Sequence, residues 1–199
     1  HRNERPDRMQ YRQLGKTKFM CSTLVFGCGA ALAGGKAVRL LGRAFEQGVN
    51  HFDVGYDDYY KGSERHLAPF LKANRDQVWV TSKAPARVTG EGPLTVEQAQ
   101  GAAKYWTGQM ELSLERLELD YVDSYYFMGV NNPELLKSDE LIGAFRTARN
   151  AGKVGHLGIS THENAQECLE AIIDIEEYSL AMIAITPAEI VYLAGRDHE

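Results

Sequence analysis

The chain has 199 residues, which suits one domain with a sizeable core or a part of a larger domain. With 44% apolar and 25% charged residues it has the composition of an ordinary soluble globular protein. Its net charge of −5, without a basic cluster, argues against nucleic acid and anionic membranes as partners. No apolar run reaches the ~18 residues that span a bilayer. Three cysteines without a CxxC pair are a poor disulfide framework, which favours a reducing compartment such as the cytoplasm.

Residues 1–8 are polar and have no apolar period, so we expect a flexible tail, a tag remnant or the remainder of a removed targeting segment. A single domain is expected over residues 9–199, and it opens with a short hairpin from Met9 onward. Apolar runs then predict strands at 23–27, 50–54, 78–82, 121–128, 156–160 and 181–185.

Helical spacing of apolar residues predicts one helix in each interval between these strands. A capping box over Thr95–Gln98 marks the start of the longest helix, and Cys168 lies at an apolar position of the last one, as a packed thiol would. Three segments are predicted as loops: the Gly/Ala-rich stretch 28–35, the tyrosine-rich stretch 56–62 and 131–133.

Strands that alternate with helices are typical of βαβ units and a parallel sheet, either a barrel or a doubly wound sheet. A dinucleotide-binding GxGxxG after Gly27 would require glycine at Leu32, so the sequence favours the barrel. The predicted fold class is α/β, a (β/α)8 TIM-type barrel. It is incomplete or has segments missing from this sequence, because only six of eight strands are predicted. Residues 189–195 predict a last helix or a displaced seventh strand.

Asp53 and Lys83 end two consecutive predicted strands, so both are expected at the same rim of the barrel. Because charges are seldom buried unless paired, they are expected to form an ion pair. The ammonium would lower the pKa of a nearby tyrosine, and Tyr59 and Tyr60 are the candidates. There are structural alternatives. Asp53 could only accept hydrogen bonds from the backbone of the next loop, and the two tyrosines could only pack their rings while their hydroxyls face water.

Two further groups have a structural and a functional interpretation. Ser160 and Thr161 end the fifth strand, where their hydroxyls could hold a ligand amide or cap the next helix. His51 shares a strand face with Asp53, so a metal pair completed by His156 or His162 is an alternative, although no metal is the preferred prediction.

Several segments, in the right order from about residue 9 to residue 162, resemble the aldo-keto reductases. They are Tyr11–Thr17, Gly48–Asp53, Gly62–Glu64, Val80–Lys83, Leu114–Asp123 and Gly152–Ser160. The resemblance implies a barrel that binds a nicotinamide cofactor, NADP(H) ahead of NAD(H), and reduces a small aldehyde or ketone by hydride transfer. It implies Asp53, Lys83 and a tyrosine, Tyr59 ahead of Tyr60, as catalytic residues, with Ser160 and Thr161 at the cofactor.

The sequence departs from that family at several functional positions. The position of the family's tyrosine holds Asp58, that of its active-site histidine holds Met128, and that of its asparagine holds Thr161. The family's glutamine on the sixth strand is not evident in residues 181–185. Two alternatives therefore stay open: a non-catalytic cofactor-binding or sensory barrel, and a metal-dependent hydrolase or lyase that uses His51 and Asp53. The sequence predicts neither the substrate nor the oligomeric state.

Overall fold

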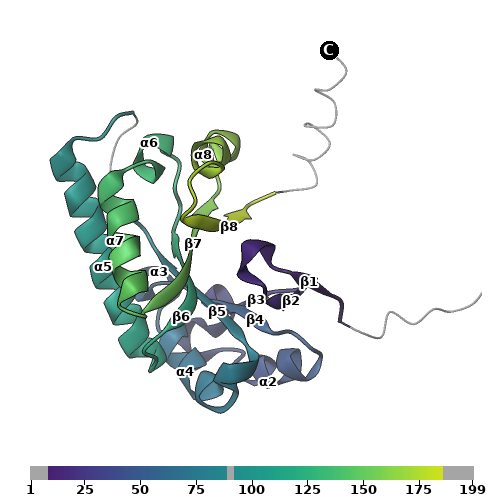
Figure 1. Cartoon of the computed structure of the whole chain (residues 1–199). Coiled ribbons are helices and arrows are strands. Elements are labelled where there is room, and N and C mark those ends of the chain that lie inside the picture. The colour runs from purple at the N-terminus through teal and green to yellow at the C-terminus, as the bar shows by residue number, and fades with distance from the viewer. Residues whose placement is uncertain (1–8, 89–91, 186–199) are drawn as a thin grey trace, which may run out of the picture.

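The computed structural model describes residues 9–88 and 92–185 (Figure 1). Strands β1 (Tyr11–Gln13) and β2 (Met20–Ser22) form an antiparallel hairpin, joined through a 3-10 turn at Gly15–Thr17. This confirms the predicted opening hairpin. The predicted tail and the predicted element at 189–195 lie outside the described residues.

Six further strands form one parallel sheet in which each strand pairs with the next one along the chain. They are β3 (Phe26–Gly27), β4 (His51–Asp53), β5 (Trp79–Ala84), β6 (Val122–Phe127), β7 (Val154–Thr161) and β8 (Tyr178–Ile183). This order requires a crossover between every pair of strands. The sheet curls, with helices along its outer side (Figure 1). The predicted fold class, an incomplete (β/α)8 barrel, is confirmed.

Five helices fill the five intervals between these strands, as predicted. They are α2 (Arg39–Glu46), α4 (Ser63–Asn74), α5 (Val96–Leu117), α7 (Asp139–Asn150) and α8 (Ala165–Ile172). The predicted capping box begins α5: the Gln98 backbone N–H donates to Thr95 Oγ1 at 3.2 Å, and the Thr95 N–H donates to Gln98 Oε1 at 2.9 Å. Local sequence therefore sets the start of the longest helix.

The prediction of three loops was wrong, because each contains a short helix. The first contains α1 (Cys28–Leu32), followed by a 3-10 turn, the second α3 (Asp57–Tyr60) and the third part of α6 (Pro133–Leu136). A single helical turn is too short to show a 3.6-residue period. The predicted strand bounds also need correction at β3, which has only two residues, and at β8, which begins at Tyr178 rather than at 181.

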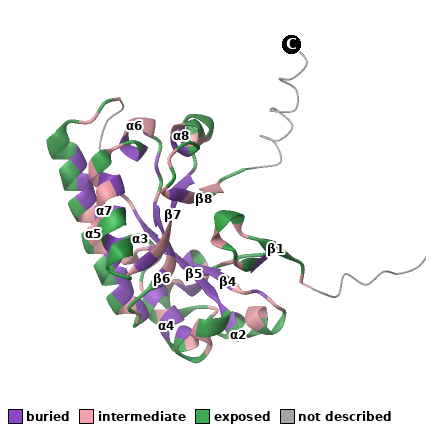
Figure 2. Ribbon diagram, viewed as in Figure 1, coloured by how far each residue is buried: buried purple, intermediate pink, exposed green. Residues whose placement is uncertain are grey.

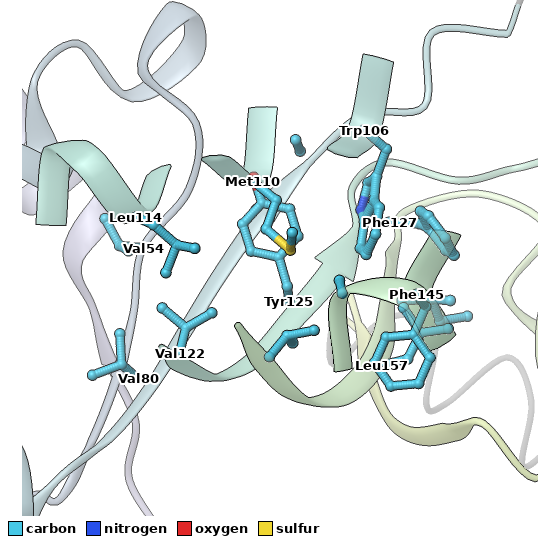
Figure 3. Packing of buried hydrophobic residues seen from close by; sticks show 14 of the residues in the cluster. Val54, Val80, Trp106, Met110, Leu114, Val122, Tyr125, Phe127, Phe145 and Leu157 are labelled. Atoms are coloured by element: carbon cyan, nitrogen blue, oxygen red, sulfur yellow. The ribbon is translucent and has the colours of Figure 1, made fainter. Parts of the chain in front are cut away.

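The core lies between the outer face of the sheet and the helices (Figure 2). Trp106 of α5 packs on Phe127 of β6 with ring centroids 4.8 Å apart, and both are fully buried (Figure 3). A smaller cluster of Trp79, Tyr126 and Leu180 lies on the inner face of the sheet and packs against residues of the N-terminal hairpin. Through the strand register, Tyr126 and Leu180 of this cluster lie at the level of Lys83 in β5.

All three cysteines are buried and free, which confirms the packed thiol predicted at Cys168. Within 9–88 and 92–185, no helix combines the length and the apolar character needed to cross a bilayer.

Candidate active site

Asp53 and Lys83 lie at the carboxyl ends of adjacent strands β4 and β5. Alternation along β5 turns Trp79, Thr81 and Lys83 to the inner face of the sheet. The Lys83 ammonium donates a hydrogen bond to Asp53 Oδ2, and the side chains are only 3% and 11% exposed. The structure thus brings together the two charges that the sequence analysis paired.

The environment of Asp53 acts on its charge in two opposing ways. Burial raises the pKa of the carboxyl group, and the Lys83 ammonium counteracts part of that rise. The second oxygen, Oδ1, is buried and accepts no hydrogen bond from any residue in the described part of the chain. The charged form of Asp53 therefore depends on Lys83, its ion-pair partner.

Tyr60 and Tyr59 end the short helix α3 and lie in different environments. The Tyr60 ring is half-buried, and Lys83 Nζ lies 5.8 Å from its centroid. Tyr59 packs edge-on against Tyr60 with centroids 4.9 Å apart, but it is 66% exposed. The geometry brings Tyr60 to the Asp53–Lys83 pair and leaves Tyr59 facing solvent.

The sequence analysis missed the two glycines that make room for the Tyr60 ring. A Cβ atom at Gly29 of α1 would overlap one edge of the ring, and a Cβ atom at Gly55 would overlap the other. Close approach of backbone to a ring is a common reason for glycine. The available signal was Gly55 itself, two residues beyond the strand-end Asp53, but a single glycine there also fits an ordinary turn.

We expect Gly29→Ala to destabilise the protein by about 1–3 kcal/mol, because the added methyl group overpacks the Tyr60 ring. Gly42→Ala is the matched control: Gly42 is an exposed helical glycine, and a methyl group added there would meet no atom within 4 Å. That control should gain about 0.5–1 kcal/mol from better helix propensity. Urea denaturation measures both, and equal effects would contradict the packing of Tyr60 against Gly29.

The expected lowering of a tyrosine pKa by Lys83 is wrong for Tyr60. Burial raises the pKa of the Tyr60 phenol, and the negative charge of Asp53 and the neighbouring Tyr59 raise it further. The physical reason is that burial, the largest cause, and the nearby negative charge of Asp53 both disfavour a phenolate at this place. A phenol with a raised pKa keeps its proton at neutral pH, but it is a weaker acid than an ordinary tyrosine.

The two main departures from the family pattern also lie near this rim. Asp58, at the position of the family's tyrosine, is exposed and lies 3.3 Å from Nη2 of Arg87. Met128 directly follows β6, and its backbone N–H donates to the Ala84 carbonyl at 2.9 Å. Its thioether is at best a weak hydrogen-bond acceptor.

Ser160 and Thr161 end β7 at the same rim, and both are buried. Ser160 Oγ accepts a hydrogen bond from the Gly129 N–H at 3.2 Å, and Thr161 Oγ1 donates to the Glu163 carbonyl at 2.6 Å. Neither caps the next helix, whose N-cap is Asn164, so that alternative is wrong. A hydroxyl can both donate and accept. Ser160 can therefore still donate and Thr161 can still accept, although consecutive residues of a strand point to opposite faces of the sheet.

His51 shares the inner face of β4 with Asp53 but takes part in a separate polar network. Its Nε2 lies 2.8 Å from Thr81 Oγ1, which lies 2.6 Å from Ser124 Oγ, and its Nδ1 lies 3.4 Å from Cys21 Sγ. Both ring nitrogens are thus occupied within the protein. No cluster of three or more potential metal-ligating side chains occurs within the described ranges. The metal-site alternative gains no support from this geometry.

His51 is expected to make the protein sensitive to acid. Burial and the Lys83 charge lower its pKa to about 4, from 6.5. Because the unfolded chain then binds the proton more tightly, stability falls as the pH drops from about 7 to about 4, by about 3 kcal/mol from this group. His51→Gln should remove that part of the pH dependence. Urea unfolding of both proteins across this pH range measures it, and parallel curves would contradict a neutral, buried His51.

A model of the aldo/keto reductase family matches residues 24–187. L-glyceraldehyde 3-phosphate reductase of Escherichia coli K12 is 29% identical over 93% of this chain and 54% of its own length. A probable aldo-keto reductase of Glycine max is 26% identical over 74% of this chain and 44% of its own length. The chain spans about half the length of these curated relatives.

Solved structures show the same likeness. An aldo-keto reductase from Bacillus halodurans, in its holo form, matches with a TM-score of 0.71 at 25% identity. The match includes 94% of this chain and 63% of that structure. A putative aldo-keto reductase from Pseudomonas aeruginosa matches with a TM-score of 0.72 at 23% identity, over 96% of this chain and 76% of that structure. At this identity the likeness shows the fold alone. With the family model matched over most of its length, this chain belongs to the aldo/keto reductase family.

Proposed function

We propose that the chain, with residues 9–199 in one barrel domain, is an oxidoreductase that reduces an aldehyde or ketone with a nicotinamide cofactor. One observation carries the proposal: the buried Asp53–Lys83 ion pair lies at the carboxyl ends of two barrel strands, beside the Tyr60 ring. In barrel enzymes that end of the strands is where the chemistry takes place. Three buried free thiols support a reducing compartment, such as the cytoplasm, as the place of action.

In the proposed reaction each residue has one role. Tyr60 donates its phenolic proton to the carbonyl oxygen as negative charge develops there. Lys83 stabilises that charge through its fixed ammonium group, and Asp53 holds the ammonium in place. Of the two tyrosine candidates we favour Tyr60 over Tyr59, because its ring lies near Lys83 and is held between two glycines.

A bound nicotinamide cofactor would supply the hydride. Ser160 would donate a hydrogen bond to its carboxamide oxygen and Thr161 would accept one from its nitrogen. We propose NADP(H) ahead of NAD(H) on the family resemblance alone. A small carbonyl substrate is supported by the E. coli relative, which is named for L-glyceraldehyde 3-phosphate.

A fluorescence titration of the purified chain with NADPH, and with NADH alongside, tests the cofactor. Saturable binding followed by cofactor-dependent reduction of any member of a panel of small aldehydes and ketones would support the proposal. A folded chain that binds neither cofactor and reduces no carbonyl would overturn it.

A second candidate function, a cofactor-binding barrel without catalysis, is favoured by the side chains at two positions. Met128 cannot donate a strong hydrogen bond or carry a charge where the family has histidine. Asp58 pairs with Arg87 at the surface where the family has its tyrosine. This candidate predicts saturable cofactor binding with no turnover over the whole panel.

A further inference from the structure

The segment that contains Tyr60 is attached to β5 at both of its ends. At its start, the Tyr56 N–H donates to the Lys83 carbonyl at 2.9 Å. At its end, the Ser82 hydroxyl donates to Glu64 Oε1 at 2.7 Å. Tyr60 thus lies between two attachments to β5. One attachment is made to Lys83 and the other to its neighbour Ser82.

Glu64 is a costly residue to bury and does not belong to the site described above. It lies in the first turn of α4 with its side chain fully buried. Its ion-pair partner is Arg116 of α5, whose Nη1 lies 3.6 Å from Glu64 Oε2. Burial raises the pKa of the Glu64 carboxyl, and hydrogen bonds from Ser113 and Ser82 counteract the rise. If packing were the only requirement, apolar residues in place of the ion pair would serve as well or better.

The connection between Tyr60 and Glu64 is short and conformationally fixed. Lys61 and Gly62 both have left-handed backbone conformations, with φ of 42° and 83°, and the Gly62 N–H donates to Asp57 Oδ1 at 2.6 Å. A displacement of Glu64 would therefore be passed on to α3 and to the Tyr60 ring rather than absorbed by a loose loop.

We propose that Glu64 is a positioning residue: by binding Ser82, it fixes the segment that holds Tyr60 relative to Lys83. The inference rests on the proposed function, in which Tyr60 and Lys83 act together. Glu64 touches neither residue's reacting group in this arrangement and acts through Ser82 and the backbone.

The test removes the polar attachment without leaving a buried charge alone. In the double variant Glu64→Met/Arg116→Met both members of the ion pair become apolar, a change that often preserves stability. We expect a urea midpoint that falls only slightly, because the buried Ser82 hydroxyl loses its acceptor, and an unchanged KM for NADPH. The kcat for carbonyl reduction should fall by roughly tenfold to a hundredfold, the scale of a misplacement by about 1 Å. The control is Asp123→Met/Arg75→Met. That ion pair, at 2.8 Å, holds the amino end of β5 through the Val80 N–H, and its loss should leave kcat unchanged.

A second measurement does not need turnover. The ionisation of the Tyr60 phenol is followed by its ultraviolet absorbance as the pH is raised. For each protein, the absorbance of the same protein carrying Tyr60→Phe is subtracted, so that only Tyr60 contributes. We expect this titration to move towards the ordinary tyrosine value in the Glu64→Met/Arg116→Met protein, because a loosened ring is better solvated, and to stay in place in the control.

The two measurements separate the inference from the proposed function. If the unmodified protein reduces no carbonyl, the proposed function fails, and the phenol titration still decides the role of Glu64. If the double variant keeps both the phenol titration and the kcat of the unmodified protein, Glu64 does not position Tyr60. A strongly lowered urea midpoint with an unchanged phenol titration would likewise overturn the inference and leave Glu64 a structural residue.

Discussion

Replacing Tyr60 with phenylalanine is expected to lower the kcat of carbonyl reduction by about 10²–10⁴-fold, the usual contribution of a general acid. The change removes only the phenolic hydroxyl and leaves the ring between Gly29 and Gly55, so the fold should be unaffected. The KM for NADPH should also stay the same, because the proposed carboxamide contacts come from Ser160 and Thr161. Steady-state kinetics with a carbonyl substrate measures both constants.

Tyr59→Phe is the matched control, since it makes the same change on the adjacent residue. The Tyr59 ring is 66% exposed, so its hydroxyl is solvated, and kcat should stay within about twofold. A large loss in Tyr59→Phe together with full activity in Tyr60→Phe would reverse the assignment. Full activity in both variants would mean that neither phenol donates the proton.

Much of the fold could be predicted because its signals are long and periodic. All six parallel strands and the five helices between them overlap the segments that apolar spacing predicted, although the bounds of β3 and β8 differ. The short helices α1, α3 and α6 could not be found in this way, because a turn of four or five residues has no measurable period. The end of the domain remains a prediction, since residues 186–199 lie outside the described ranges.

The candidate site was predictable where its residues end strands and less so where they lie between strands. Parallel strands present their carboxyl ends at one rim, and that rule alone is enough to place Asp53 near Lys83. The choice between Tyr59 and Tyr60 depended on a turn whose helical form the sequence did not reveal. The raised pKa of Tyr60 also depends on burial and on the nearby charge of Asp53, which are properties of the packed protein.

The stability of the site should depend on its two charges as a pair. Lys83→Met leaves Asp53 buried without its cation, which we expect to cost about 3–5 kcal/mol of unfolding free energy. Asp53→Asn should be costly for the same reason, because it leaves the Lys83 ammonium buried alone. In the double variant Asp53→Asn/Lys83→Met neither charge remains, so much of the loss should be recovered. Urea unfolding of the four proteins at neutral pH measures this coupling, and additive losses would contradict it.

Activity should not follow stability through these variants, and the difference tests the proposed role of Lys83. The double variant has lost the ammonium that stabilises developing charge on the carbonyl oxygen, so it should stay at the low kcat of Lys83→Met. In Lys83→Met alone, burial still raises the pKa of Asp53 and no ammonium counteracts it. The pKa of Asp53 is therefore higher in the folded protein than in the unfolded chain. The stability of that variant should therefore fall as the pH rises above about 4. If the double variant recovered turnover together with stability, Lys83 would serve the fold through Asp53 and not the chemistry.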